Sequence, residues 1–323
     1  MNKVDIQKAA EILRAGGLIA LPTETVYGLG ADARNETAIR RIFAAKERPF
    51  DHPLIVHLAD FSQVPAWARE VPPAAIQLAN AFWPGPLTMI LKKQPHVLDI
   101  VTGNQDTIGL RIPCHPVAQA VLQEFGHGIA APSANKFTHI SPTTADAVHE
   151  ELGAKVDLIL DGGECDVGLE STIVDLSGKM PVILRPGMIN AEAIEKVIEQ
   201  PVKSEQSEIH FVRVPGTHHV HYAPVTPSIL LDSNNIPAFL QSLRADDLPA
   251  AVITHSKLVL PDLKKIHHVN LPEEPQAYAH DLYRTLRALD NLRFQCIVIE
   301  SVPPEPCWDA IRDRLNKASG RRV

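Results

Sequence analysis

The regular pattern of this chain stops between residues 201 and 227. The stretch PVKSEQSEIHFVRVPGTHHVHYAPVTP has neither the helical nor the strand period, and it contains four prolines. That composition is typical of an extended linker. On both sides of it, apolar runs alternate with amphipathic segments, which predicts α/β domains. Because 323 residues are too many for one ordinary core, we predict an N-terminal domain over 1–204, a linker over 205–227 and a smaller C-terminal domain over 228–323.

The composition indicates a soluble globular protein, with 45% hydrophobic and 21% charged residues. The formal net charge of −7 gives no global sign of a nucleic-acid binder. No apolar run approaches the ~20 residues that span a bilayer, so we expect no membrane partner. The four cysteines are widely spaced and form no C-x-x-C pair. They favour a reducing, cytoplasmic compartment.

Helix signals are clear in the N-terminal part. Asn35 is a predicted cap for a helix that must end before Pro49. Thr143 with Asp146 predicts a capping box, and Asn190 predicts a third cap. The predicted strands are the apolar runs LIALP, PLIVHL, LTMILKK, TIGLRIP, HGIAAPSAN, VDLILDGG, STIVDL and PVILRPG, then SILLD, AAVITHS and FQCIVIE after the linker.

The run LPTETVYGLGADA at residues 21–33 allows several interpretations. Its GLGADA matches the G-x-G-x-x-A dinucleotide fingerprint, which keeps a nicotinamide oxidoreductase as one alternative. In that fingerprint the first glycine closely follows a strand, whereas here the polar TETVYG intervenes. The nearest acid at the expected spacing, Asp51, lies in a predicted loop. Both observations disfavour the dinucleotide interpretation.

Four basic residues stand at the ends of predicted elements. Lys46 and Arg48 lie two apart where a helix meets a proline-rich loop, and Arg111 and Arg185 lie within or at the end of strands. Phosphates and carboxylates are natural partners of such groups. Helix-dipole stabilisation and a structural salt bridge are the alternatives for Lys46 and Arg111, respectively. His57 has the same ambiguity, and a lone strand histidine is more often a satisfied core group than a ligand contact.

Hydroxyl and amide groups follow several strands, as Ser133, Asn135, Ser141 and Ser171 do. Ligands of open α/β sheets bind beyond the carboxyl ends of strands. The sequence has no G-x-x-x-x-G-K-[ST] phosphate loop and no G-x-S-x-G nucleophile elbow. Together these groups suit the binding of a polyanion and a carboxylate. They favour catalysis by positioning of the substrates rather than by a covalent intermediate.

Along the chain there is a set of motifs: PTETVYGLG, KERP, HPLIVHL, WPGPLT, GLRIP, APSAN, SPT, LESTIVDL, ILRPG and PGTHHVHYAP. As a set, they resemble the threonylcarbamoyl-AMP synthase family in its long two-domain form. The resemblance implies a YrdC-like twisted open α/β sheet with a concave basic cavity, followed by a smaller Rossmann-like α/β domain. It implies that L-threonine, bicarbonate and ATP give L-threonylcarbamoyl-adenylate and pyrophosphate. A separate tRNA threonylcarbamoyl transferase complex would then use the adenylate.

The resemblance also assigns residues by motif. The implied threonine-binding set is Thr25, His57, Arg111, the backbone of Ala131, and Ser171. The run at residues 21–33 would then form the threonine-side wall, with Thr25 as its contact and with glycines that allow tight turning. The implied ATP-binding set is Arg48, His52, Thr107, Ser133, Asn135, Ser141, Arg185 and Tyr222. Lys46 and Arg48 are the expected catalytic residues, with Lys46 and Asn135 close to the phosphates. Mg²⁺ is expected to ride on the phosphates with few protein ligands.

Some positions depart from the family pattern. His52 replaces a common Asn, Phe137-Thr138 replaces Ser-Gly, and His218 and Val220 stand at often basic or small positions. The stiff VPGTHHVHYAP segment is predicted to fold over the catalytic cavity as a lid. An RNA-binding module with a basic concave surface remains an alternative function, with weak RNA binding possible in either case. Only 5% of residues are Phe, Trp or Tyr, which disfavours stacking platforms for RNA.

Overall fold

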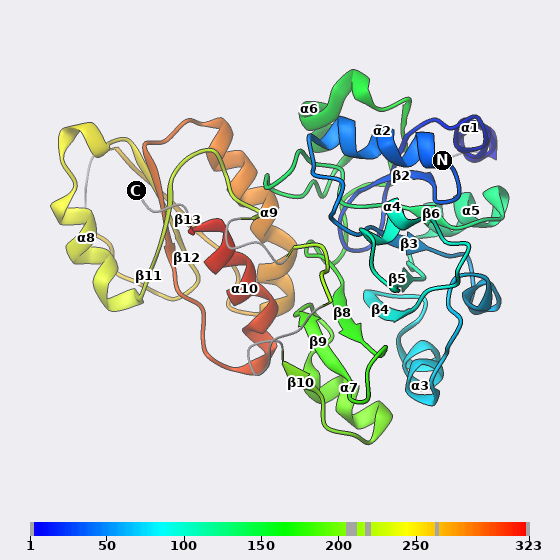
Figure 1. The fold of residues 1–323 in the computed structure, drawn as a ribbon. Coiled ribbons are helices and arrows are strands. Elements are labelled where there is room, and N and C mark those ends of the chain that lie inside the picture. Colours follow the sequence, from blue (N-terminus) through cyan, green and yellow to red (C-terminus); the bar gives the residue numbers. More distant parts are fainter. Residues whose placement is uncertain (1–2, 205–211, 217–220, 262–264, 321–323) are drawn as a thin grey trace. The chain divides into compact units, whose positions relative to one another are not determined.

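Two sheets organise the chain (Figure 1), each in its own unit of the computed structural model. The structure describes residues 3–204, 212–216, 221–261 and 265–320. The first unit holds residues 1–137 and 141–217, and the second holds 138–140 and 218–323. The predicted linker is therefore shared between the units. Its residues 205–211 and 217–220, which include His218 and Val220, lie outside the described residues. The domain boundaries stay a prediction.

The sheet of the first unit has ten strands in the order β10-β9-β8-β4-β5-β3-β6-β2-β1-β7. It mixes parallel pairs, such as β3 with β5, and antiparallel pairs, such as β4 with β5. The strands are β1 (Ile19–Leu21), β2 (Gly28–Asp32), β3 (Ile55–His57), β4 (Leu87–Lys92), β5 (Thr107–Arg111), β6 (Ile129–Ala130), β7 (Leu158–Ile159), β8 (Thr172–Asp175), β9 (Val182–Arg185) and β10 (Lys203–Ser204). The α/β prediction for this unit is confirmed.

The helices of this unit bear out two of the three predicted caps. They are α1 (Lys3–Arg14), α2 (Glu36–Lys46), α3 (Pro73–Phe82), α4 (Asp99–Thr102), α5 (Pro116–Phe125), α6 (Ala145–Leu152) and α7 (Ala191–Ile198), with 3-10 turns η1 (Phe61–Ala66) and η2 (Gly153–Lys155). Asn35 and Asn190 cap α2 and α7, as predicted. The predicted cap at Thr143 is wrong, because Thr144 accepts the hydrogen bond from Ala147 N. Two adjacent threonines offer the same chemistry, and only the backbone decides between them.

One face of the first sheet is closed by helices. Ile42 of α2, Leu78 of α3 and Ile194 of α7 belong to one buried cluster with the strand residues Val56 and Leu110. Apolar burial of this kind is the main favourable contribution to folding. This cluster therefore anchors the sheet on its helix-covered side.

The opposite face is covered in two separate patches. Leu13 of α1 and Leu122 of α5 pack with Ile19 and Ile129 at the β1 and β6 strands. A second patch joins strand residues Ile55, Ile90, Ile173, Val182 and Leu184 to the linker residues Val212 and Val214. The described start of the linker is therefore packed on the sheet rather than extended away from it.

The GLGAD part of the opening motif is strand β2, which the sequence analysis missed. Neither Gly28 nor Gly30 has a positive φ, so the prediction that they allow tight turning is wrong. A Cβ on Gly30 would lie 3.0 Å from Ile129 Cγ2 and 3.3 Å from Ile19 Cγ1. Glycine is needed here because neighbouring side chains press on the strand. The dinucleotide alternative also loses its basis, since these glycines lie inside a strand rather than after one.

The second unit contains a parallel sheet in the order β11-β14-β12-β13. Its strands are β11 (Ser228–Leu231), β12 (Ala250–Thr254), β13 (Ile266–Asn270) and β14 (Cys296–Glu300), and its helices are α8 (Ile236–Ser242), α9 (Pro275–Asn291) and α10 (Asp309–Ala318), with 3-10 turns η4 (Ser233–Asn235), η5 (Ala245–Asp247) and η6 (Pro306–Trp308). Figure 1 shows α8 on one side of this sheet and α9 and α10 on the other. The prediction of a smaller Rossmann-like unit is confirmed. No helix in the described ranges is long and apolar enough to cross a membrane.

A buried carboxylate ties the carboxyl ends of three strands in this second sheet. Glu300, at the end of β14, accepts hydrogen bonds from Ser233 Oγ at 2.6 Å and Ser256 Oγ at 2.5 Å. Its second oxygen accepts from the backbone N–H groups of His255 and Ser256. Burial by itself raises the pKa of Glu300, but these hydrogen bonds outweigh it and lower the pKa to about 2. The ionised carboxylate therefore acts as an internal acceptor.

We expect Glu300→Gln to destabilise the protein by about 1.5–3 kcal/mol, because hydrogen bonds to a charged acceptor are worth that much. The amide would also present N–H groups to donors. A carboxyl whose folded pKa is depressed stabilises the fold above its unfolded pKa. The difference from the unsubstituted protein should therefore shrink as the pH falls from about 4.3 to about 2. Urea unfolding at several pH values measures this, with the exposed Glu273→Gln as the control; a pH-independent difference would contradict it.

Candidate functional site

The strand residues of the site share one face of the first sheet. β3 and β5 run parallel, with His57 opposite Arg111 at their carboxyl ends. His57 lies two residues beyond Ile55, so it points away from the helix-covered cluster that contains Val56. The site therefore begins on the face that α1, α5 and the linker cover only in patches.

Arg111 is buried and bonded on three sides. Its Nη2 donates to Glu24 Oε1 at 2.6 Å, its Nη1 donates to Thr25 Oγ1 at 2.9 Å, and its Nε donates to Gly85 O at 3.2 Å. The other Glu24 oxygen accepts from Cys114 N at 3.1 Å. The structural salt bridge considered for Arg111 is thus present. A guanidinium has five N–H donors, so one on each terminal nitrogen is left for a ligand.

Glu24 is the site residue that the sequence analysis did not assign. It is only 2% exposed, and a buried carboxylate needs a partner to remain ionised. Its position between the two threonines of PTETV was the available signal. The partner could not be found from sequence, because Arg111 is 87 residues further along the chain.

His57 is buried with an unsatisfied ring nitrogen. Its Nδ1 has no hydrogen-bond partner among the described residues. Burial, helped by the nearby Arg111 charge, lowers the pKa of His57 to about 3. The imidazole is therefore neutral near pH 7. A neutral ring with an open nitrogen suits a polar ligand group.

Ser171 and Arg185 meet next to β4 and β8. Arg185 donates to the Ser171 carbonyl from Nε at 3.1 Å and from Nη2 at 2.8 Å, and to the Ser171 hydroxyl at 3.1 Å. That hydroxyl also lies 2.8 Å from Thr88 Oγ1. Arg185 Nη1 donates to Pro215 O, which belongs to the linker, at 3.2 Å. Arg185, a predicted ATP-binding residue, thus connects Ser171, a predicted threonine-binding residue, to Pro215 of the linker.

Lys46 organises the loop that follows β6. Its Nζ donates to the carbonyls of Ser133 and Asn135, at 2.5 Å each. Burial, and then the charge of Arg48, lower the pKa of Lys46 well below its usual value. Lys46 and Arg48 are 2% and 9% exposed. Truncating either side chain would therefore leave a buried cavity.

The other predicted ATP residues surround this loop or lie apart from it. Arg48 donates to Pro53 O at 3.0 Å, and the ring of His52 meets the edge of the Phe137 ring at 5.3 Å. Two of the departures from the family pattern are thus in contact with each other. Ser141 Oγ donates to Glu170 Oε1 at 2.6 Å.

Thr107 begins β5, four residues before Arg111. The Ala131 N–H already donates to Ile55 O, so a ligand contact there would fall on its carbonyl. Tyr222 belongs to the second unit, where its buried ring lies 5.9 Å from that of Tyr283 and under the guanidinium of Arg314. Its predicted contact with ATP stays a prediction, as does a concave cavity around the basic groups.

Comparisons with known proteins cover the whole chain. Residues 11–187 match the family model described as "Telomere recombination", and residues 189–320 match the "Threonylcarbamoyl-AMP synthase, C-terminal domain" model. The threonylcarbamoyl-AMP synthase of Pyrococcus abyssi is 38% identical, over 98% of this chain and 95% of the relative. This chain belongs to the threonylcarbamoyl-AMP synthase family. The Bacillus subtilis member of the family is also 38% identical, over the full chain and 95% of its own length.

Solved structures agree with this assignment. P. abyssi Sua5, in a crystal structure with L-threonine, shares 37% identity and a TM-score of 0.92, over 99% of this chain and 95% of that one. Escherichia coli YciO, at 30% identity and a TM-score of 0.50, matches 56% of this chain and 88% of its own. The family assignment therefore rests on both units, and the curated relatives are named as synthases rather than as RNA-binding modules.

We expect Arg111→Met to destabilise the first unit by about 3–5 kcal/mol, because it leaves the buried Glu24 charge unpaired. The double variant Arg111→Met, Glu24→Gln should recover part of that loss, since the carboxylate charge is removed with its partner. Urea unfolding of both variants gives the comparison. Arg69→Met, which breaks the exposed pair with Asp106, is the control and should change the midpoint little. A double variant less stable than Arg111→Met would contradict the pairing argument.

Proposed function

We propose that this chain makes L-threonylcarbamoyl-adenylate from L-threonine, bicarbonate and ATP, and releases pyrophosphate. The observation that carries the proposal is the pairing of His57 and Arg111 at the ends of adjacent strands. One offers an unsatisfied neutral ring nitrogen, and the other offers two remaining N–H donors. A relative that is 37% identical over nearly the whole chain binds L-threonine in its crystal structure.

In this proposal Arg111 holds the threonine carboxylate in a fork. Glu24 and Thr25 fix the guanidinium from the other side, which orients it before the substrate arrives. His57, the Ala131 carbonyl and Ser171 provide polar groups around the same amino acid. Threonine is therefore positioned by groups whose own partners already restrict their motion.

The basic groups near the β6 loop would hold ATP. The threonine amine attacks the carbon of bicarbonate, and water is lost, which gives a carbamate. A carbamate oxygen then attacks the α-phosphorus, and the bond to the β-phosphate breaks to release pyrophosphate. Lys46, Arg48 and Arg185 would offset the charge that develops on the phosphates. The buried Lys46 also fixes the Ser133 and Asn135 carbonyls, and hence the shape of the loop.

Mg²⁺ is proposed to accompany ATP. Hard oxygen donors suit this ion, and the Ser141 hydroxyl with the Glu170 carboxylate offers such donors beside the predicted ATP groups. No group of three or more His, Cys, Asp or Glu side chains suited to a metal occurs within the described ranges. A metal bound chiefly by phosphates fits that donor set. When bound, it would neutralise phosphate charge.

We further propose that the product passes to a tRNA threonylcarbamoyl transferase complex and that the reaction takes place in the cytoplasm. The mixed anhydride of a carbamate and a phosphate is an activated acyl donor, so an acceptor reaction must consume it before water does. Incubation with ATP, threonine and bicarbonate, followed by mass spectrometry for the adenylate and pyrophosphate, tests the activity. Pyrophosphate release that does not depend on threonine would count against the proposal.

We expect Lys46→Met to lower turnover by about 100-fold or more, the usual effect of removing one preorganised donor. Methionine keeps the stem of the side chain, so the cavity is smaller than with alanine. Steady-state kinetics gives the turnover, and thermal unfolding reports the fold. Lys155→Met is the matched control, because Lys155 lies at the same helix end, donating to Ala45 O, yet is largely exposed. Unchanged turnover in a folded Lys46 variant would remove Lys46 from the catalytic set.

The start of the linker is held against two predicted ATP loops. Gln105 donates to Arg213 O at 2.9 Å and accepts from Arg213 N at 2.6 Å. The Arg213 side chain donates to Gly103 O at 2.6 Å and lies 3.4 Å from Asp51. Asp51 is next to His52, and Gln105 is two residues from Thr107. We propose that this part of the lid closes over the nucleotide.

We expect Gln105→Ala to raise the KM for ATP about fivefold to thirtyfold, because two hydrogen bonds worth about 1 kcal/mol each are lost. The KM for threonine should change less. ATP with threonine should also protect the 205–227 segment from protease in the unsubstituted protein, and less so in the variant. Gln94→Ala is the control, since Gln94 bonds Pro65 O instead. If cleavage is equal with and without substrates, the segment is only a spacer.

A further inference from the structure

Thr88 carries a buried hydroxyl on the face of the first sheet that holds Arg111. It is the second residue of β4 and is 0% exposed. Ile90, two residues further on, lies opposite Gly109, and Gly109 precedes Arg111 by two residues in β5. Side chains two residues apart in a strand point to the same face, so Thr88 and Arg111 share one face. Thr88 therefore belongs to the floor of the candidate site.

The neighbouring strands fix both branches of the Thr88 side chain. β4 lies between β8 and β5 in the sheet. A Cβ on Gly109 of β5 would lie 3.5 Å from Thr88 Cγ2, so the methyl group lies toward that glycine. The hydroxyl lies 2.8 Å from the hydroxyl of Ser171, the residue before β8. Because a β-branched side chain has few rotamers, these contacts direct the Thr88 hydroxyl toward Ser171.

Ser171 also receives a hydrogen bond from a cation. Arg185 Nη2 lies 3.1 Å from Ser171 Oγ, and a guanidinium can only donate. One lone pair of the Ser171 hydroxyl is therefore used by Arg185. The bond between Thr88 and Ser171 can run in either direction. Within the described residues, however, Ser171 is the only hydrogen-bond partner of Thr88 Oγ1.

An account of the two hydroxyl protons decides the direction of that bond. One hydrogen bond between two hydroxyls uses one of their two protons. If Ser171 donates, the proton of the fully buried Thr88 has no acceptor. If Thr88 donates, both lone pairs of Ser171 are occupied, and the Ser171 proton is left for a ligand. Because buried donors are rarely left without a partner, the second arrangement is favoured once an acceptor binds.

We propose that Thr88 is a positioning residue that makes Ser171 a hydrogen-bond donor to an oxygen of L-threonine. With both lone pairs occupied, Ser171 cannot accept from the threonine ammonium group. Its partner is therefore the carboxylate or the side-chain hydroxyl of the substrate. This inference rests on the proposed function, because it takes threonine as the ligand of Ser171.

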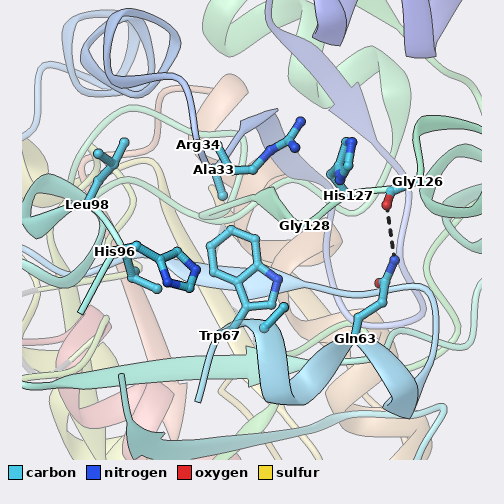
Figure 2. Close-up of a pocket in the computed structure, with 11 residues that line it drawn as sticks. Ala33, Arg34, Gln63, Trp67, His96, Leu98, Gly126, His127 and Gly128 are labelled. Atoms are coloured by element: carbon cyan, nitrogen blue, oxygen red, sulfur yellow. Dashed lines mark hydrogen bonds between the residues drawn. The ribbon is translucent and has the colours of Figure 1, made fainter. Parts of the chain in front are cut away.

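The cavity drawn in Figure 2 is a separate space in the first unit. It has a volume of about 390 Å³, and its lining includes Trp67, His96 and His127. Neither Thr88 nor Ser171 is among its lining residues. A threonine molecule bound there would not respond to a change at Thr88. Variants of Thr88 therefore also report which of the two spaces threonine occupies.

Calorimetric titration with L-threonine tests the proposal without requiring turnover. Thr88→Val keeps the branched shape and removes the hydroxyl. It should weaken threonine about threefold to tenfold, the range expected for one hydrogen bond. In a Ser171→Ala background the same substitution should have little further effect, because Thr88 acts through Ser171. Equal losses in both backgrounds, or no loss in Thr88→Val alone, would overturn the inference.

Three further variants separate this role from a general loss of packing. Thr88→Ser retains the hydroxyl and should recover most of the affinity for threonine. Thr102→Val removes another buried hydroxyl of the first unit, one that bonds Asp99 O in α4. His96→Ala changes the cavity of Figure 2. The last two variants should bind threonine as the unsubstituted protein does, and weakened binding in either would count against a specific role for Thr88.

The analogue 2-aminobutyrate, which lacks the threonine hydroxyl, separates the two acceptors. If Ser171 donates to the carboxylate, Thr88→Val should weaken this analogue as it weakens threonine. If Ser171 donates to the substrate hydroxyl, the analogue should bind equally to both proteins. A neutron structure of the threonine complex shows the protons directly. A Ser171 proton that points to Thr88 would overturn the inference.

Adenylate formation is measured separately, so that the inference and the proposed function can fail independently. Threonine binding that depends on Thr88 through Ser171, without any adenylate, would contradict the proposed function alone. Adenylate formation with threonine affinity that is insensitive to Thr88→Val would contradict this inference alone. An unsubstituted protein that binds no threonine would contradict both.

Discussion

The buried ion pair between Arg111 and Glu24 holds the first unit's site together. It links the end of β5 to the loop between β1 and β2, two parts of the chain that are 87 residues apart. Burying both charges is costly, and the pair is maintained because Cys114 N, Thr25 and Gly85 supply further hydrogen bonds. The opening motif is therefore a wall of the site because a strand from elsewhere anchors it.

The two faces of the first sheet are covered differently, and the site lies on the less completely covered face. Helices α2, α3 and α7 close one face with a continuous apolar cluster. The other face is covered by α1 and α5 at one end and by linker residues Val212 and Val214 at another. Polar groups such as His57 and Arg111 can point to this second face without burial under a full helix layer. The same arrangement lets the linker take part in the site while it covers the apolar strands.

Polar groups at strand ends also stabilise the second unit, but there they bond to one another and are not left for a ligand. Parallel α/β sheets bind ligands beyond their carboxyl ends. In this sheet Glu300 fills that place and takes up the donors of Ser233, His255 and Ser256. A carboxylate of the chain itself thus satisfies groups that could otherwise hold an anion. The two sheets share a class of architecture and use their strand ends differently.

The sequence by itself determined most of the strands, three helices and their order along the chain. Local signals sufficed for this, because the cap at Asn35 and the stop before Pro49 depend only on neighbouring residues. It failed where two neighbours offered the same chemistry, as at Thr144, and where a glycine was read as a turn, as in β2. Gly30 is required by contacts with Ile19 and Ile129, and no local pattern shows them.

Only the tertiary structure decided which polar groups meet. The partner of Arg111, the acceptors of Lys46 and the contact between His52 and Phe137 all join distant segments. Residue type restricts the chemistry available to each of these groups, since a buried charge must be paired. The choice of partner depends on strand order and on which face a side chain points to. Strand order and side-chain direction follow from the packing of the whole sheet. That packing depends on the free energy of burial summed over many residues, which no single motif encodes.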